Sequence, residues 1–101
     1  MRTRSILATV ALAMPASASA ETMVASYYAA PAPHVAAHRS LPKGTRLVLT
    51  NPRNGRSAHV VVRDRGPYVG GRSLDISTQR ARHLGFTQRG VTRLKVHIVR
   101  R

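Results

Sequence analysis

Carboxylates that could act as an acid or a base are scarce in this chain. There are only three, Glu21, Asp64 and Asp75. Glu21 lies close to the predicted start of the folded part, where residues are usually mobile. Asp64 precedes a Gly-Pro pair and Asp75 precedes a predicted helix, positions at which aspartate also serves as a turn or helix cap. Acid–base chemistry by a carboxylate therefore depends on Asp64 or Asp75.

The histidines give no pattern of metal ligands. His34 and His38 share one segment, but no third ligand follows at the spacing of a zinc site, and the chain contains no cysteine. A glycine-rich phosphate loop and a serine nucleophile elbow are also missing from the sequence. We therefore expect neither a metal nor a cofactor. The remaining histidines are His59, His83 and His97.

The first 20 residues predict a secretory signal peptide. Arg2 and Arg4 precede the apolar stretch 6–13, and Ala18 and Ala20 supply the small residues of a cleavage site. The apolar stretch is too short for a transmembrane helix, which needs about 20 residues. We expect cleavage after Ala20 and an exported protein, located in the periplasm or in the cell wall. Without cysteine, we expect no disulfide and no lipid anchor.

The net charge of +14 predicts an anionic partner. Nucleic acid is disfavoured because the chain is predicted to be exported, has only four aromatic residues and scatters its arginines along its length. Anionic cell-wall polymers fit better. A secreted cationic protein that binds membranes or nucleic acid is the least favoured class.

Alternating apolar residues predict a mostly-β domain with one short helix. Residues 29–37 contain two prolines and are expected to form a loop. The unbroken run Val60–Val62 predicts a strand that is buried on both faces. Ser77 is a plausible N-cap of a helix that runs through Leu84 and stops at Gly85. The expected strands are 24–28, 45–50, 57–63, 72–76 and 91–99.

Several segments, in order, resemble those of the rare lipoprotein A (RlpA) family of cell-wall proteins. The resemblance extends over residues 36–99 and implies a six-stranded double-psi β-barrel with one or two short helices. It places an N-terminal strand and loop at 21–35 and the barrel at 36–101, with a barrel start near residue 23. The matching segments are AAHRSLPKGT (36–45), TNPRNGRS (50–57), VVVRDRGPY (60–68) and RSLDIS (72–77).

The resemblance also implies an activity and a site. Family members include lytic transglycosylases that cleave peptidoglycan glycan strands to 1,6-anhydro products, a reaction for which one acid suffices. By motif match, His38 and Asp64 fall on the family's active-site residues, and Asp75 falls on an aspartate of the same groove in expansin-like relatives. We expect substrate contacts from Tyr28, Arg65, Tyr68 and Arg72.

A non-catalytic module is the main alternative. Expansin-like relatives bind cell-wall polymers, and the arginines of this chain suit an anionic polymer. Only seven residues, 29–35, separate Tyr28 from the first matching segment, whereas the family usually has a longer stretch there. With this shorter stretch, the expected glycan groove lacks one of the walls that it has in other family members.

Overall fold

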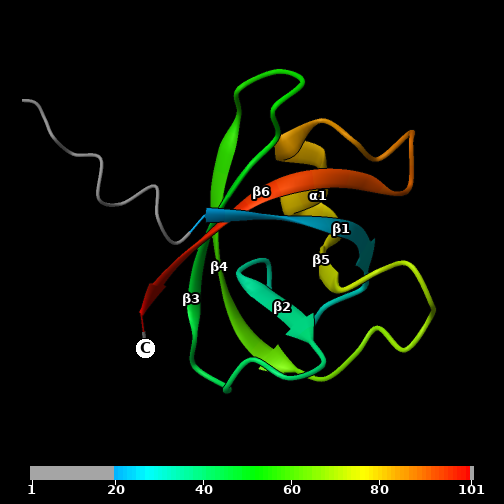
Figure 1. The fold of residues 1–101 in the computed structure, drawn as a ribbon. Helices are drawn as coiled ribbons and strands as arrows, with labels where there is room; N and C mark the ends of the chain where they lie inside the picture. The colour runs from blue at the N-terminus through cyan, green and yellow to red at the C-terminus, as the bar shows by residue number, and fades with distance from the viewer. Residues whose placement is uncertain (1–19, 101) are drawn as a thin grey trace, which may run out of the picture.

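The computed structural model describes residues 20–100, which form a closed six-stranded barrel with one helix on its outside (Figure 1). The strand order around the barrel is β1-β5-β2-β4-β3-β6. Apart from Ala20, the predicted signal peptide lies outside the described residues. The elements are β1 (Ala20–Tyr28), β2 (Val35–His38), β3 (Arg46–Thr50), β4 (Ser57–Asp64), β5 (Leu74–Ser77), α1 (Thr78–Leu84) and β6 (Thr92–Arg100).

Two parallel pairs close the ring. β1 runs parallel to β5 and β2 runs parallel to β4, whereas β2 and β5 are antiparallel. β1 also pairs with β6, so it is a strand of the barrel from its first residue. Because the ring is closed, no strand edge is left unpaired, which matters for a small chain without disulfides.

The core fills the inside of the barrel, and strand alternation explains its composition. On β6, Leu94 and Val96 are buried while Arg93 and Lys95 are exposed, as the sequence predicts. The fully buried apolar side chains come from every side of the ring and from α1. The largest are Leu47, Leu49, Val60, Val62, Leu74, Ile76, Leu84, Phe86, Leu94 and Val96.

The structure corrects two expectations about strands. Val61 is only half-buried between the fully buried Val60 and Val62, so β4 is not buried on both faces. A barrel strand turns one face inward and the other outward. The second correction is β2, which lies within the segment expected to be a loop. Its four residues hydrogen-bond to β4 on one side and to β5 on the other, and the prolines lie before it.

The helix has the predicted ends. The Ser77 hydroxyl accepts a hydrogen bond from the Arg80 amide, and Gly85 closes the helix in the left-handed region at φ 81°. The side-chain amides of Asn51 and Asn54 both donate to the Leu84 carbonyl, at 2.8 and 2.9 Å. These bonds tie the helix end to the hairpin between β3 and β4. Among residues 20–100 there is no helix long and apolar enough to cross a membrane.

Gly85→Ala is expected to destabilise the fold more than Gly55→Ala. Both glycines have a positive φ, 81° and 79°, so either alanine adopts a left-handed conformation at a cost of about 1 kcal/mol. Only at Gly85 does an added Cβ meet another atom, the Asn54 side-chain nitrogen at 2.8 Å. Displacing that amide breaks its bond to Leu84 and adds about 1 kcal/mol.

Denaturant unfolding of the two variants measures this difference. Equal losses of unfolding free energy would mean that the Asn54 contact is unimportant and that only the backbone conformation matters.

Candidate active site

A row of paired residues crosses four neighbouring strands of the barrel. Ser26 on β1 pairs with Asp75 on β5, Asp75 pairs with Ala37 on β2, and Ala37 pairs with Asp64 on β4. Directly paired residues turn their side chains to the same face of a sheet. The two aspartates therefore flank Ala37 on the outer face, with their backbones about 10 Å apart across two strand spacings.

A β-bulge turns Asp64 to this face. Ala36 pairs with Val62, but the next residue, Ala37, pairs with Asp64, so Arg63 is an extra residue on β4. In an unbroken strand Asp64 would point to the same side as the buried Val62. The bulge therefore places the carboxylate outside the core, beside the second acid.

Each carboxylate is held by a hydroxyl group from β1. The Tyr28 hydroxyl donates to Oδ2 of Asp64 at 2.5 Å, and the Ser26 hydroxyl donates to Oδ1 of Asp75. Within residues 20–100 no other side chain hydrogen-bonds to either carboxylate. One oxygen of each acid is thus fixed by the protein while the other is left for a ligand.

The Tyr28 hydroxyl remains protonated at any physiological pH. Burial raises the pKa of Tyr28 far above its ordinary value of 10.0, and the hydrogen bond to Asp64 and the charges of Asp64 and Asp75 raise it further. Tyr28 acts on Asp64 as a permanent donor.

His38 ends β2, directly after Ala37. Its Nδ1 accepts hydrogen bonds from the backbone amides of Ser40 and Leu41, at 3.1 and 3.0 Å. Because Nδ1 is an acceptor, the ring proton of the neutral form is on Nε2. Within the described part of the chain, no hydrogen bond joins His38 to Asp64 or Asp75.

The surroundings keep His38 neutral. Burial lowers the pKa of His38 below its ordinary value of 6.5, the charges of Arg39 and Arg65 lower it further, and Glu21 acts in the opposite direction. Arg65 also supports the segment around His38, since its Nη1 donates to the carbonyls of His38 at 3.1 Å and Leu41 at 2.7 Å. Arg65 is expected from the sequence to contact the substrate, and in the structure it also stabilises the backbone around His38.

The connection between β4 and β5 carries two further candidates. It joins the strand that ends with Asp64 to the strand that contains Asp75. Tyr68 is 73% exposed there. Arg72 is half-buried, and its Nε is buried without a hydrogen-bond partner among residues 20–100. The Tyr68 ring is therefore open to a ligand, whereas the Arg72 Nε is enclosed by the protein.

Ser26 belongs to the site but is not among the residues predicted from the sequence. It is buried and its only role in the site is the bond to Asp75. Ser26 lies two residues before Tyr28 in a predicted strand, so the two side chains are on the same face of the sheet. This two-residue spacing is the signal in the sequence that could have identified Ser26. No group of three or more His, Cys, Asp or Glu side chains that could hold a metal occurs among the described residues.

Comparison with known proteins identifies the same part of the chain. The model of the lytic transglycolase family, a double-psi β-barrel family, matches residues 26–96. This range contains both aspartates, His38 and the two β1 hydroxyl groups.

Three curated relatives are similar over almost the same region. The chain is 52% identical over 66 residues to the probable endolytic peptidoglycan transglycosylase RlpA of Nostoc sp., which is 65% of this chain and 18% of that protein. The probable enzyme of Aquifex aeolicus is 48% identical over 67 residues, 66% of this chain and 30% of that protein. The RlpA of Pasteurella multocida is 39% identical over 66 residues, 65% and 22% of the two chains. The match thus spans less than a third of each relative.

Solved structures agree on the fold. The Streptomyces papain inhibitor has a TM-score of 0.64 at 21% identity, covering 80% of this chain and 94% of that one. Cerato-platanin 3 of M. perniciosa has a TM-score of 0.61 at 16% identity, covering 78% and 94%. At these identities the likeness concerns the double-psi β-barrel alone.

The stability of the domain is expected to fall as the pH drops below 6.5. The folded state lowers the pKa of His38, so its contribution to stability is complete above the ordinary pKa and is lost as the pH falls through the lower folded value. Protonation of Nδ1 also breaks the bonds from Ser40 and Leu41.

The measurement is the unfolding free energy as a function of pH for the wild type, His38→Asn and His59→Gln. His38→Asn should flatten the decline, since its side-chain oxygen can accept the same bonds without titrating. His59 is exposed and serves as the control. An unchanged decline in His38→Asn would assign the effect to other groups.

Proposed function

Because this chain belongs to the lytic transglycolase family, we propose that it cleaves peptidoglycan glycan strands to 1,6-anhydro products in the periplasm or cell wall. One observation carries the proposal. Asp64 is half-buried, one of its oxygens is fixed by Tyr28, and a second carboxylate lies across Ala37 on the same face. This arrangement provides one positioned acid and a surface on which a sugar can lie beside it.

The proposed reaction needs a single proton carrier. Protonated Asp64 gives its proton to the glycosidic oxygen as the bond from that oxygen to the sugar C1 breaks. The C6 hydroxyl of the same sugar then attacks C1, and Asp64 takes the hydroxyl proton. A 1,6-anhydro ring forms, no water is consumed, and the carboxyl group is protonated again.

The hydrogen bond from Tyr28 determines which oxygen of Asp64 can do this. It occupies Oδ2, so Oδ1 is the oxygen that faces the glycosidic bond. Because the Tyr28 hydroxyl does not itself ionise, it keeps this orientation throughout the cycle. Tyr28 is therefore a positioning residue.

Asp75 and His38 support the sugar that carries C1 in this proposal. Positive charge develops on the sugar ring as the glycosidic bond breaks, and the Asp75 carboxylate lies about two strand spacings from Asp64 to stabilise it. Neutral His38 offers its Nε2 proton to a substrate oxygen. Of the remaining groups, the exposed ring of Tyr68 suits the apolar face of a sugar. Arg72 is half-buried, and the terminal nitrogens of its guanidinium group suit a hydroxyl or carbonyl oxygen.

A binding-only, expansin-like role is the second candidate. The observation that favours it is the exposed apolar surface of Tyr68 and Val69, which are 73% and 54% exposed in the connection between β4 and β5. Such a platform holds a polymer whether or not a bond is cleaved. Experiments on Asp64 distinguish the two functions.

Asp64→Asn is expected to abolish product formation. The amide cannot carry the transferred proton, and the loss of a general acid lowers the rate by at least about a hundredfold. The test incubates the purified protein with glycan strands stripped of peptide and identifies anhydro-terminated sugars by mass spectrometry. If neither the wild type nor the variant gives product and both bind sacculi equally, the binding-only role is correct.

Tyr28→Phe is expected to lower kcat roughly ten- to a hundredfold, because the Asp64 carboxyl is then free to rotate away from the glycosidic oxygen. Its matched control is Tyr27→Phe, which removes a hydroxyl bonded at 2.7 Å to the Thr87 carbonyl, away from both acids.

The comparison requires kcat, KM and the unfolding free energy of both variants. Tyr27→Phe should lose stability and keep its kcat. Equal kcat values in the two variants would show that the Tyr28 hydroxyl does not position Asp64.

A further inference from the structure

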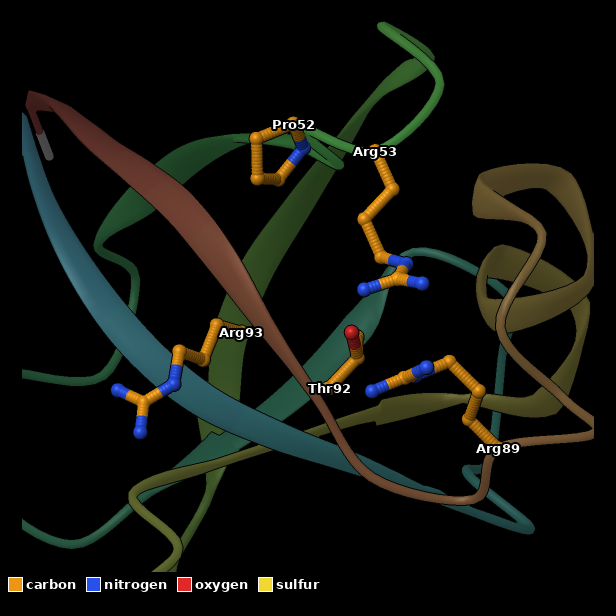
Figure 2. Close-up of a pocket in the computed structure, with 5 residues that line it drawn as sticks. All are labelled: Pro52, Arg53, Arg89, Thr92 and Arg93. Atoms are coloured by element: carbon orange, nitrogen blue, oxygen red, sulfur yellow. The ribbon is translucent and has the colours of Figure 1, made fainter.

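A second, cationic site lies between the β3–β4 hairpin and the start of β6. It is a surface pocket of about 250 Å³ lined by Pro52, Arg53, Arg89, Thr92 and Arg93. Figure 2 shows the guanidinium groups of Arg53 and Arg89 extending toward each other across the Thr92 hydroxyl, whereas Arg93 extends to the other side of β6. Arg53, Arg89 and Thr92 therefore form the centre of the pocket, and Arg93 adds positive charge at its edge.

The hairpin side of the pocket is distant from Asp64. Arg53 belongs to the hairpin that precedes β4 and Asp64 is the last residue of β4, so the eight-residue strand, spanning roughly 25 Å, lies between them. Figure 1 shows that hairpin and the connection after β4 at opposite ends of the barrel. None of the five residues that line the pocket hydrogen-bonds to Asp64, Asp75, Tyr28 or His38.

The two converging guanidinium groups have no anionic partner of their own. Within residues 20–100, neither Arg53 nor Arg89 forms a side-chain hydrogen bond or an ion pair. Like charges that face each other repel, and a chain with three carboxylates has little negative charge to offset them. Thr92 is 5% exposed, and its hydroxyl lies between the two groups. An oxyanion in this position would accept hydrogen bonds from both arginines and from the hydroxyl.

We infer that this pocket binds a carboxylate group of the glycan strand, the lactyl carboxylate of N-acetylmuramic acid. The inference rests on the proposed function for its choice of polymer. A glycan strand without stem peptides has this carboxylate on every second sugar as its only charged group. A stem peptide converts this carboxylate to a neutral amide, which removes the negative charge that the two arginines would bind.

The separation of the two sites fits a polymer. A small molecule cannot contact Asp64 and the hairpin at the other end of β4 at the same time, but a strand of several sugars is long enough to reach both. Binding at the pocket then holds the strand while the bond beside Asp64 is cleaved. A variant of the pocket therefore affects KM rather than kcat.

The binding test uses the full chain and a double variant, Arg53→Gln with Arg89→Gln. Its control is Arg82→Gln with Lys95→Gln, which removes the same charge at exposed positions outside the pocket. The probes are N-acetylmuramic acid, its lactyl methylamide and inorganic phosphate, titrated while backbone amide shifts are followed by NMR. The acid should shift the amides of Arg53 and Thr92, with affinity falling at least roughly tenfold in the pocket variant and little in the control.

Three outcomes would overturn the inference. The first is that the methylamide binds as well as the acid, because the carboxylate is then not recognised. The second is that phosphate shifts the same amides more strongly than the acid, because the pocket is then a phosphate site. The third is that both double variants lose affinity equally, because only net charge then matters.

A cleavage assay separates this inference from the proposed function. With peptide-free strands, the pocket variant should raise KM and leave kcat unchanged, whereas Asp64→Asn should lose product and still show the amide shifts with N-acetylmuramic acid. If no protein cleaves the strands, the proposed function fails, but the binding test still gives its result because it requires no turnover.

Discussion

One extra residue on β4 determines which face of the barrel the Asp64 carboxylate occupies. β2 lies between β4 and β5, and the bulge at Arg63 shifts the register so that Asp64 pairs with Ala37. Asp75 reaches the other side of Ala37 through an ordinary antiparallel register. Ala37 is 4% exposed and small, so it leaves room between the acids. The carboxylates of Asp64 and Asp75 thereby lie on one face of the sheet, because β2 is paired with a strand on each side in the closed ring.

Local hydrogen bonds hold the two acids in place. β1 supplies a hydroxyl for each carboxylate, from Ser26 and Tyr28, and the spacing of two residues turns both to the same face. The segment after β2 is fixed in a comparable way. There the His38 ring accepts from two backbone amides, and Arg65 donates to two carbonyls. The rigid strands and these bonds preorganise the site.

The cationic charge is organised on a different part of the surface. Arg53 and Arg89 converge on Thr92 beyond the far end of β4, next to the hairpin that Asn51 and Asn54 tie to the end of α1. The barrel thus separates an acidic row from a basic pocket. Such a division suits a polymeric ligand that contacts both, since in the proposed function each site would bind a different chemical group of the same strand.

The sequence by itself determined the helix and its caps, the long alternating strands and the candidate acids, because these depend on local periodicity and on residue type. The family resemblance supplied the six-stranded barrel, and the family model and the strand ring confirm it. Only the tertiary structure showed β2, whose small residues carry no strong strand signal and which forms by pairing on both sides. It alone also gave the bulge, the Ser26 contact and the converging arginines. Each of these depends on register between strands distant in sequence, which local patterns do not encode.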